Sequence, residues 1–416
     1  MRQLTALLMA MGLLACGSSS TGPSTGNLTV IVSAASGVTP SVTVTGPSSY
    51  SKTLSATTTL AGLTPGSYTV AAASATVTGA IVSTVYNGTV TGSPAMVTNG
   101  GTAAAAATYA LRGGSGALWV ASFNMSVLDG IQASSLGASG SPGMLSIPSV
   151  KATAAVAFDS SGDLWAGGGN SDSIVEYTPP QLAGIGGTTP AVVLTGSYLA
   201  YVGGLAFDKS GNLWASDVID DAVFEYTASQ LAAGGSVTPA AQIFNAGLVS
   251  PLGLAFDANG TLWVANFNAN QIMGWAAATL ANPPSTPSYT VQVACAPVYI
   301  AFDASGNLWA SCQGAGVVEF TPSQLTAGGS PTPTVSITSV SGPRGVAFDN
   351  GGNLWVADDQ TNEIFQLTGS QLASSGAPTP AVAISWAAGT SRPFMIAFDP
   401  HATGSPIAGG ARLARR

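Results

Sequence analysis

The sequence is poor in charge, histidine and cysteine. Of its 416 residues only 7% are Asp, Glu, Lys or Arg, about a quarter of the average share, and it has one histidine and three cysteines. Nucleic-acid binders and disordered acidic tails need dense charge, and helical bundles need charged residues on their solvated faces. The composition argues against all three classes. Beyond the first fifteen residues no apolar run approaches the roughly 18 residues that a membrane-spanning helix needs.

The sequence is rich in turn-forming and apolar residues. The chain contains 52 Gly and 25 Pro, and 46% of its residues are hydrophobic, which favours an all-β protein with many turns. The net charge of -8 is unevenly placed, because residues 1–116 hold three bases and no acid, whereas 117–416 hold all 18 acids and seven bases. This break predicts two domains.

The N-terminus has the form of a secretion signal. Arg2 precedes an apolar run from Leu4 to Ala15, which is too short to span a bilayer. The small residue directly before Cys16 resembles the bacterial lipobox. That resemblance implies a lipoprotein signal peptide over 1–15, lipidation of Cys16 and a flexible tether over 16–26. Gly17 stands where an Asp would favour the inner membrane, so the outer membrane is expected; the alternative is an ordinary secretory signal with an incidental cysteine.

Residues 27–112 alternate apolar and polar residues with the period of β-strands, separated by turn residues. The segment from Leu60 to Val70 resembles the turn-and-strand signature of PEGA-type and prealbumin-like β-sandwiches. No acid, histidine or thiol occurs in 27–112, so acid–base or metal chemistry has nothing to act with there. We expect a spacer or adhesive β-sandwich.

From residue 113 the chain repeats itself. Ala-Phe-Asp recurs with Phe at 158, 207, 256, 302, 348 and 398, and Leu-Trp recurs with Trp at 119, 165, 214, 263, 309 and 355. Steps of 46 to 50 residues made of short strands indicate propeller blades. Thr followed three residues later by Gln, as in Thr227 and Gln230, is a capping box and predicts a short helix outside several blades.

The two repeated elements are out of step at the ends of this region. Leu118-Trp119 lacks a preceding Ala-Phe-Asp, and Ala397-Phe398-Asp399 lacks a following Leu-Trp. If a C-terminal strand completes the first blade, Ala-Phe-Asp at 397–399 and Leu-Trp at 118–119 belong to one blade. This closure also removes an exposed sheet edge. We therefore predict a six-bladed β-propeller over 113–400 and a disordered basic tail over 401–416.

The repeated phrase Phe-Asp-x-x-Gly-Asn-Leu-Trp-x-Ala resembles NHL repeats and their relatives, the streptogramin lyases and the calcium-dependent gluconolactonases. This resemblance implies the architecture far more than an activity. Histidines act in the streptogramin lyases, and the one histidine here, His401, falls in the tail. No catalytic residue is therefore predicted.

Two cysteines, Cys295 and Cys312, remain after Cys16. In an oxidising compartment leftover cysteines usually pair, and the repeat register places these two at the same end of one hairpin. A disulfide is expected, with two buried thiols as the alternative.

Most of the acids repeat with the blades. Fifteen of the 18 occupy repeat-equivalent positions, six of them in the inner turn, and only Asp220, Asp359 and Glu363 fall outside the pattern. The position three residues after each Trp is the best candidate for a site, since it lies at the end of the second strand. Around the ring it holds Ser122, Gly168, Asp217, Asn266, Cys312 and Asp358.

The polar members of this set, Ser122, Asp217, Asn266 and Asp358, could line a rim that binds a sugar or Ca²⁺. The alternative is that they cap loop amides. Asp217 and Asp358 belong to opposite blades and should not share an ion, so no metal site is assigned.

Three functions remain in view. We expect a monomeric envelope lipoprotein, anchored to the membrane by its lipid, whose propeller is a non-enzymatic scaffold for a protein or glycan. A metal-dependent lactonase or lyase of the six-bladed class is the alternative, and a passive structural envelope protein is a third. No cofactor and no nucleic-acid partner are expected.

Overall fold

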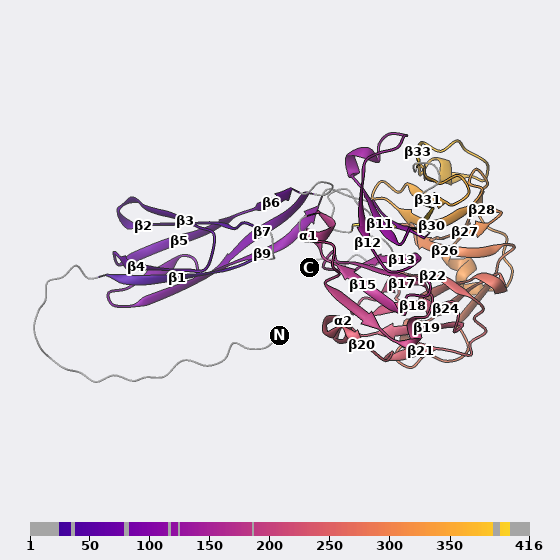
Figure 1. The fold of residues 1–416 in the computed structure, drawn as a ribbon, viewed down its shortest axis with the longest axis horizontal. Helices are drawn as coiled ribbons and strands as arrows, with labels where there is room; N and C mark the ends of the chain where they lie inside the picture. The colour runs from indigo at the N-terminus through magenta and orange to yellow at the C-terminus, as the bar shows by residue number, and fades with distance from the viewer. Residues whose placement is uncertain are drawn as a thin grey trace, which may run out of the picture. The chain divides into compact units, whose positions relative to one another are not determined.

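The computed structural model describes residues 25–34, 38–78, 83–114, 118–123, 125–184, 187–385 and 392–399. These residues form two compact units made almost entirely of β-strands, which confirms the predicted all-β class (Figure 1). Cys16 and His401 lie outside the described residues. In the described part of the chain no helix is long and apolar enough to cross a membrane.

The N-terminal region from Gly26 to Gly114, most of which belongs to the first unit, contains two sheets. Its five-stranded sheet has the order β4-β1-β9-β7-β6 and its four-stranded sheet the order β3-β2-β5-β8. The strands are β1 (Gly26–Ser33), β2 (Ser41–Gly46), β3 (Tyr50–Leu54), β4 (Thr58–Leu63), β5 (Gly66–Ala73), β6 (Ala75–Thr78), β7 (Ser83–Thr91), β8 (Ala95–Val97) and β9 (Thr102–Gly114), with a 3₁₀ turn η1 (Pro47–Ser49).

The two sheets of this N-terminal region are joined by a tyrosine. The Tyr109 hydroxyl of β9 accepts a hydrogen bond from the Ser41 amide of β2 at 2.8 Å and donates one to the Ser41 carbonyl at 2.9 Å. Alternate residues of β1 are buried, with Leu28 and Val30 at 0% exposure. The period-two pattern of the sequence therefore places one face of that strand in a core.

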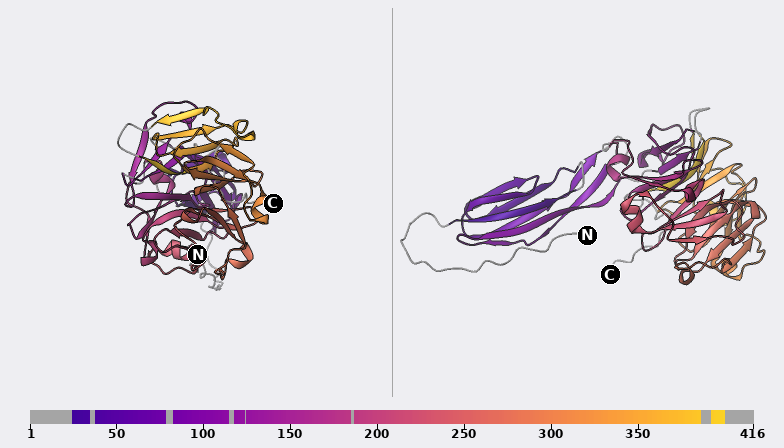
Figure 2. Two further views of the ribbon diagram at one scale, coloured as in Figure 1. Left: turned by 90° about the vertical axis from the view of Figure 1, so that its right-hand side faces the viewer. Right: turned by 60° about the horizontal axis from the view of Figure 1, so that its bottom comes forward.

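The second unit is a six-bladed propeller, as predicted. Five four-stranded sheets and one five-stranded sheet follow one another around a central channel, and Figure 1 shows them in chain order from the purple β11 and β12 to the yellow β33. Two further views show the same blades from other sides (Figure 2).

The inner strands of blades 1 to 6 are β34 (Pro393–Phe398), β13 (Thr153–Phe158), β17 (Val202–Phe207), β22 (Pro251–Phe256), β26 (Ala296–Phe302) and β30 (Pro343–Phe348). The second strands are β10 (Leu118–Ser122), β14 (Leu164–Gly168), β18 (Leu213–Asp217), β23 (Leu262–Asn266), β27 (Leu308–Gln313) and β31 (Leu354–Asp358). Each second strand pairs with its inner strand antiparallel.

The third strands are β11 (Val127–Ile131), β15 (Ser173–Tyr177), β19 (Ala222–Tyr226), β24 (Gln271–Trp275), β28 (Gly316–Phe320) and β32 (Glu363–Leu367). The outer strands are β12 (Met144–Pro148), β16 (Val192–Thr195), β21 (Ala241–Ile243), β25 (Tyr289–Gln292), β29 (Val335–Ile337) and β33 (Val382–Ser385). A two-residue strand β20 (Gly235–Ser236) adds parallel to β16 and so connects the periphery of blade 3 to blade 2.

The ring closes through the C-terminal strand. β34 pairs antiparallel with β10, with Ala397 opposite Trp119 and Phe398 opposite Leu118. This is the closure that the out-of-step repeat predicts, and it leaves blade 1 without an open inner edge.

Short helices lie outside three blades, as predicted: α1 (Pro179–Leu182), α2 (Ala228–Ala233) and α3 (Pro322–Ala327). Each has a capping box in which the Thr and the Gln satisfy each other's backbone amides. In blade 6 the equivalent Gln371 begins a 3₁₀ turn, η6 (Gln371–Ala373), because Gly369 stands where the others have Pro or Ala and weakens the helix. Further 3₁₀ turns are η2 (Ala133–Ser135), η3 (Ser197–Leu199), η4 (Phe267–Ala269) and η5 (Ala277–Thr279).

Aromatic residues of the repeat fill the gaps between blades. Trp355 of blade 6 meets Phe398 of blade 1 edge-on at 5.9 Å between ring centroids, and Trp165, Trp214 and Trp309 meet the Phe of the next blade in the same way. The Trp of one blade thus packs against the Phe of the next blade. Edge-to-face contacts of this kind add about 0.5–1.5 kcal/mol each to the burial of the rings.

Candidate functional site

The two ends of the propeller differ in what they expose. We call the end that carries the tight turns between inner and second strands the turn face. The opposite end, where second strands end and inner strands begin, we call the loop face. All four polar rim residues predicted from the sequence lie at the loop face, and all four are buried.

Asp217 binds the backbone of two loops in blade 3. Its Oδ2 accepts a hydrogen bond from the Tyr201 amide at 3.0 Å, and its Oδ1 accepts from the amides of Ile219 and Asp220 at 2.8 and 3.1 Å. Burial raises the pKa of Asp217 above its usual value, and these amides oppose the rise. The carboxylate is thus committed to holding the loop that enters β17 beside the loop that leaves β18.

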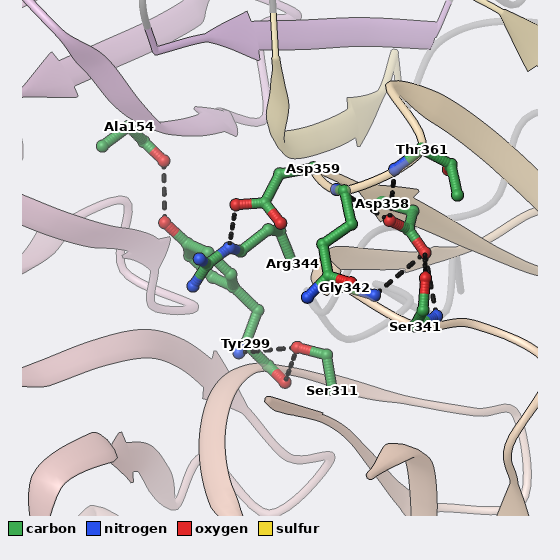
Figure 3. A network of polar contacts seen from close by, with 10 residues as sticks. Ala154, Tyr299, Ser311, Ser341, Gly342, Arg344, Asp358, Asp359 and Thr361 are labelled. Carbon is green, nitrogen blue, oxygen red and sulfur yellow. Dashed lines mark hydrogen bonds and ion pairs between the residues drawn. The ribbon is translucent and has the colours of Figure 1, made fainter. Parts of the chain in front are cut away.

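Asp358 repeats this arrangement in blade 6 (Figure 3). Oδ2 accepts from the amides of Ser341 and Gly342, both at 3.0 Å. Oδ1 accepts from the amides of Gln360 and Thr361 at 2.9 and 3.0 Å. Four backbone amides therefore surround one buried carboxylate.

Asn266 and Ser122 are also occupied by protein partners. The Asn266 Oδ1 accepts from the Val249 amide at 2.6 Å, and its Nδ2 donates to the Gly247 carbonyl at 3.0 Å. The Ser122 hydroxyl donates to Asp129 Oδ2 at 2.5 Å, and Asp129 also accepts from Ser146.

In blade 5 a disulfide, and not a hydrogen bond, links the end of the second strand to the segment before the inner strand. Cys295 and Cys312 form a disulfide with 5.6 Å between their Cα atoms, which confirms the predicted pair. The two cysteines are 17 residues apart, the same separation as Ser341 and Asp358 in blade 6. In blade 2, where Gly168 has no side chain, the backbone amide of Gly169 bonds the Ala152 carbonyl directly at 3.0 Å.

These contacts bind the polar atoms of the rim set to other parts of the protein. Asp217, Asn266 and Asp358 accept hydrogen bonds from loop amides, as expected for loop capping, whereas Ser122 binds the side chain of Asp129. Among the residues that the structure describes, no three His, Cys, Asp or Glu side chains come together in an arrangement that could hold a metal ion.

A different group lies at the centre of the loop face. We call Phe123, Tyr201, Tyr299, Arg344, Asp359 and Phe394 the central cluster. The Arg344 Nε donates to Asp359 Oδ2 at 2.7 Å, and the Arg344 Cζ lies 5.3 Å from the centroid of the Phe394 ring. Phe394 stacks on Phe123 at 5.1 Å and meets Tyr299 edge-on at 5.9 Å.

Tyr299 crosses the channel. Its hydroxyl lies 2.8 Å from the carbonyl of Ala154 in blade 2 (Figure 3), although the side chain belongs to blade 5. The same hydroxyl lies 2.7 Å from the carbonyl of Gly203 in blade 3. Inner strands have one unpaired edge, so these carbonyls would otherwise lack a partner. Burial raises the pKa of Tyr299 well above its usual value, and the charge of Arg344 opposes the rise, so the phenol stays a donor.

Four of the other five blades have a small residue at the position equivalent to Tyr299. The position three before the repeat Phe is Tyr299 in blade 5 and Ala155, Gly204, Gly253, Gly345 or Met395 elsewhere. A Cβ on Gly253 would lie 2.5 Å from the Tyr299 Cα, so even the backbone of blade 5 requires a glycine in blade 4.

Apolar side chains are exposed around the central cluster. Met125, Ile219 and Val249 lie in loops of the loop face with 49%, 59% and 42% of their surface exposed. They come from blades 1, 3 and 4, and the loops of Ile219 and Val249 are adjacent because the Ser250 amide bonds Asp221 Oδ1 at 2.7 Å. Groups of exposed apolar side chains are typical of interaction surfaces.

The turn-face half of the channel contains a small cavity of about 110 Å³. All six inner strands line it with the apolar residues that precede the turn Asp, such as Phe158, Leu205 and Met395. It offers no charged side chain among its lining residues, so it has no means of acid–base chemistry.

Blade 2 carries an unusual acid group at the turn face. Asp163 replaces the Asn of the repeat, and it lies with Asp159 and Glu176 where blade 3 has Asp208, Asn212 and Glu225. Burial and the neighbouring carboxylates raise the pKa of Asp163 to about 7, and burial and Asp159 raise that of Glu176 to about 7.

The fold defines this part of the chain as a six-bladed β-propeller, and a disulfide links two of its described residues. No family model matches the chain, and no curated protein matches it. A chain of the nidogen–laminin complex is similar in structure, with a TM-score of 0.50, 17% identity, and coverage of 68% of this chain and 98% of that one. At this identity the likeness shows the fold alone.

Two other structures are similar over comparable lengths. A protein of unknown function from Bacteroides caccae has a TM-score of 0.49 and 11% identity, and covers 68% of this chain and 99% of that one. Virginiamycin B lyase from Staphylococcus aureus has a TM-score of 0.41 and 17% identity, with coverage of 58% and 73%.

The central cluster was not predicted, because its basic member Arg344 lies outside the repeated pattern of acids. One signal was present: Asp359 is one of three acids outside the repeat pattern, and Arg344 lies four residues before a repeat Phe, where other blades have Gly, Ala, Val, Leu or Phe. The contact between Arg344 and Phe394 depends on ring closure, which brings blades 6 and 1 together.

Proposed function

We propose that this protein is a cell-envelope lipoprotein whose NHL-type propeller is a non-enzymatic scaffold that binds a protein or a glycan through its loop face. The observation that carries the proposal is the loop face itself. Exposed apolar side chains surround a central arginine and aromatic cluster, whereas the predicted rim residues Asp217, Asn266 and Asp358 are committed to loop backbone.

The envelope location is supported by the Cys295–Cys312 disulfide, since disulfides persist in oxidising compartments. In this proposal Cys16 is the lipid attachment point and the first unit is a β-sandwich spacer of the PEGA or prealbumin-like kind. Replacing Cys16 by Ala should move the protein from the membrane fraction to the soluble fraction. Continued membrane attachment of that variant would refute the lipid anchor.

Binding is tested with the purified chain on a glycan array and against immobilised envelope proteins. The double variant Ile219→Ser/Val249→Ser should lose binding by about tenfold or more, because it removes apolar contact area from the loop face. Val193→Ser is the matched control, since Val193 is 41% exposed on the outer strand β16, away from the loop face. Silence on both surfaces, or equal loss in the control, would count against a binding scaffold.

A further inference from the structure

We infer that Arg344 is the anchor of the loop face and that it binds a carboxylate presented by a protein partner. This inference rests on the proposed function and names the kind of partner. It starts from the way in which Arg344 is held.

The Arg344 guanidinium is fixed on two sides. Its Nε donates to Asp359 Oδ2 at 2.7 Å, and its Cζ lies over the ring of Phe394, which is itself stacked on Phe123. The side chain is only 18% exposed, so little freedom remains for it to lose on binding. Among the described residues neither Nη atom has a hydrogen-bond partner, although the guanidinium carries five N–H donors.

This geometry suits one ligand group in particular. Two Nη groups in one plane match the two oxygens of a carboxylate, which they bind through paired, charge-assisted hydrogen bonds. Asp359 balances the formal charge of Arg344 through Nε but leaves the Nη pair unused. A ligand carboxylate would complete the hydrogen bonding of a guanidinium that the fold has already oriented.

The surroundings favour a protein as the source of that carboxylate. Protein interfaces are rich in Arg, Met and aromatic residues, and Met125, Ile219 and Val249 expose apolar surface at the same face. An acidic glycan would need polar side chains for its many hydroxyls. The buried side chains of Asp217, Asn266 and Asp358, which could have served, already bond the loop backbone.

The nearby acids refine the partner further. Asp220 and Asp221 lie in the same loop as Ile219, and Asp221 is exposed. They would repel a run of acids. The expected partner segment therefore carries a single Asp or Glu flanked by apolar side chains.

The experiment uses short random peptides displayed on phage and selected on the full chain. Selected peptides should share one Asp or Glu between apolar residues. Arg344→Gln should weaken their binding by about tenfold to a hundredfold, because charge-assisted hydrogen bonds are lost. Arg344→Lys keeps the charge without the paired donors and should lose most of the affinity as well.

Two controls make the result interpretable. Lys209→Gln removes an exposed cation whose Nζ bonds the Ala258 carbonyl at the turn face, and it should leave peptide binding unchanged. Replacing the peptide acid by its amide should cause the same loss as Arg344→Gln, and the two changes together should cost no more than either alone. If the Arg344 variants do not fold, the amide form of the peptide still tests whether the protein binds a carboxylate.

Each remaining outcome counts against a stated claim. Peptides without a shared acid, or peptides that bind Arg344→Gln equally well, would overturn the role of Arg344 and leave the binding scaffold intact. Arg344-dependent binding of uronate glycans with no peptide binding would overturn the protein partner. If neither peptides nor glycans bind, the proposed function fails as well.

Discussion

The turn face and the loop face of the propeller are built from the same repeat, yet one is uniform and the other is not. In blades 2 to 6 the turn Asp accepts a hydrogen bond from the indole Nε1 of the repeat Trp, at 2.9 to 3.5 Å. At the loop face one equivalent position instead holds Ser122, Gly168, Asp217, Asn266, Cys312 and Asp358. Four of these residues, Asp217, Asn266, Cys312 and Asp358, bind the segment that leads into the inner strand of the same blade, and they do so with three different kinds of side chain.

This difference separates architecture from function. A contact that recurs in five blades indicates an architectural role, because it holds the inner turn against the Trp that packs between blades. Variety at the loop face means that individual side chains can change without loss of the fold. Binding surfaces arise in such regions.

The largest effect is expected from Asp358→Ala at the loop face. The variant leaves four backbone amides without their acceptor in a buried place, and we expect a loss of about 3 to 4 kcal/mol in the free energy of unfolding. Urea denaturation measures it. Asp358→Asn keeps one acceptor oxygen and therefore two of the four hydrogen bonds, so it should lose less than Asp358→Ala but at least half as much.

A loss below about 1 kcal/mol for Asp358→Ala would show that water replaces the carboxylate at this rim. Loop capping would then be a weaker account of the position than the ligand site that the sequence also allowed.

The disulfide of blade 5 ranks next. Replacing both Cys295 and Cys312 by Ser should cost about 3 kcal/mol, the value expected for a closed loop of about this length. The double variant Cys295→Ser/Cys312→Asp tests the equivalence between blades directly, since it rebuilds the carboxylate clamp of blades 3 and 6. It should recover part of the lost stability in denaturation experiments. If it is no better than the double Ser variant, the clamp is not transferable between blades.

The smallest effect is expected at the turn face of blade 2. Folding raises the pKa values of Asp163 and Glu176 to about 7, so their carboxyl groups lose their protons at a lower pH in the unfolded chain than in the folded protein. The charged carboxylates therefore destabilise the fold progressively between about pH 4 and pH 7, and fully above pH 7. Asp163→Asn should stabilise the protein by about 1 kcal/mol at pH 8, an amount reduced by solvent screening, and by nothing at pH 4.

Blade 3 provides the matched control for this change. Asn212 donates to Asp208 and Glu225, both at 2.9 Å, and Asn212→Asp would recreate the acid group of blade 2. Thermal unfolding should be measured for both variants across the pH range. Relative to the unmodified protein, the melting temperature of Asp163→Asn should rise with pH and that of Asn212→Asp should fall. A gain for Asp163→Asn that persists at pH 4 would exclude charge as its cause.

Much of the fold could be predicted because the repeat carries its own register. The steps between successive Trp and Phe residues specify the blades, and the mismatch at Leu118 and Ala397 specifies how the ring closes. The capping boxes at Thr227 and Thr321 predict helices because their contacts are local. The Cys295–Cys312 disulfide follows from the same register.

The candidate site could be predicted only in part. The repeat places Asp217 and Asp358 at one rim, but whether their oxygens face a ligand or a loop depends on loop backbone geometry that no pattern of residue types specifies. The domain boundaries at 112 and 113, the lipid anchor at Cys16 and the β-sandwich likewise stay predictions.

Sequence alone thus determined the all-β class, the six blades, their closure and the disulfide, because each depends on spacing or on neighbouring residues. Only the tertiary structure decided what stands at the centre of the loop face. Tyr299 reaches carbonyls in two other blades, and Arg344 meets Phe394 because ring closure sets blade 6 beside blade 1. Contacts between distant parts of a chain depend on how strands converge in space, and residue order does not record that convergence.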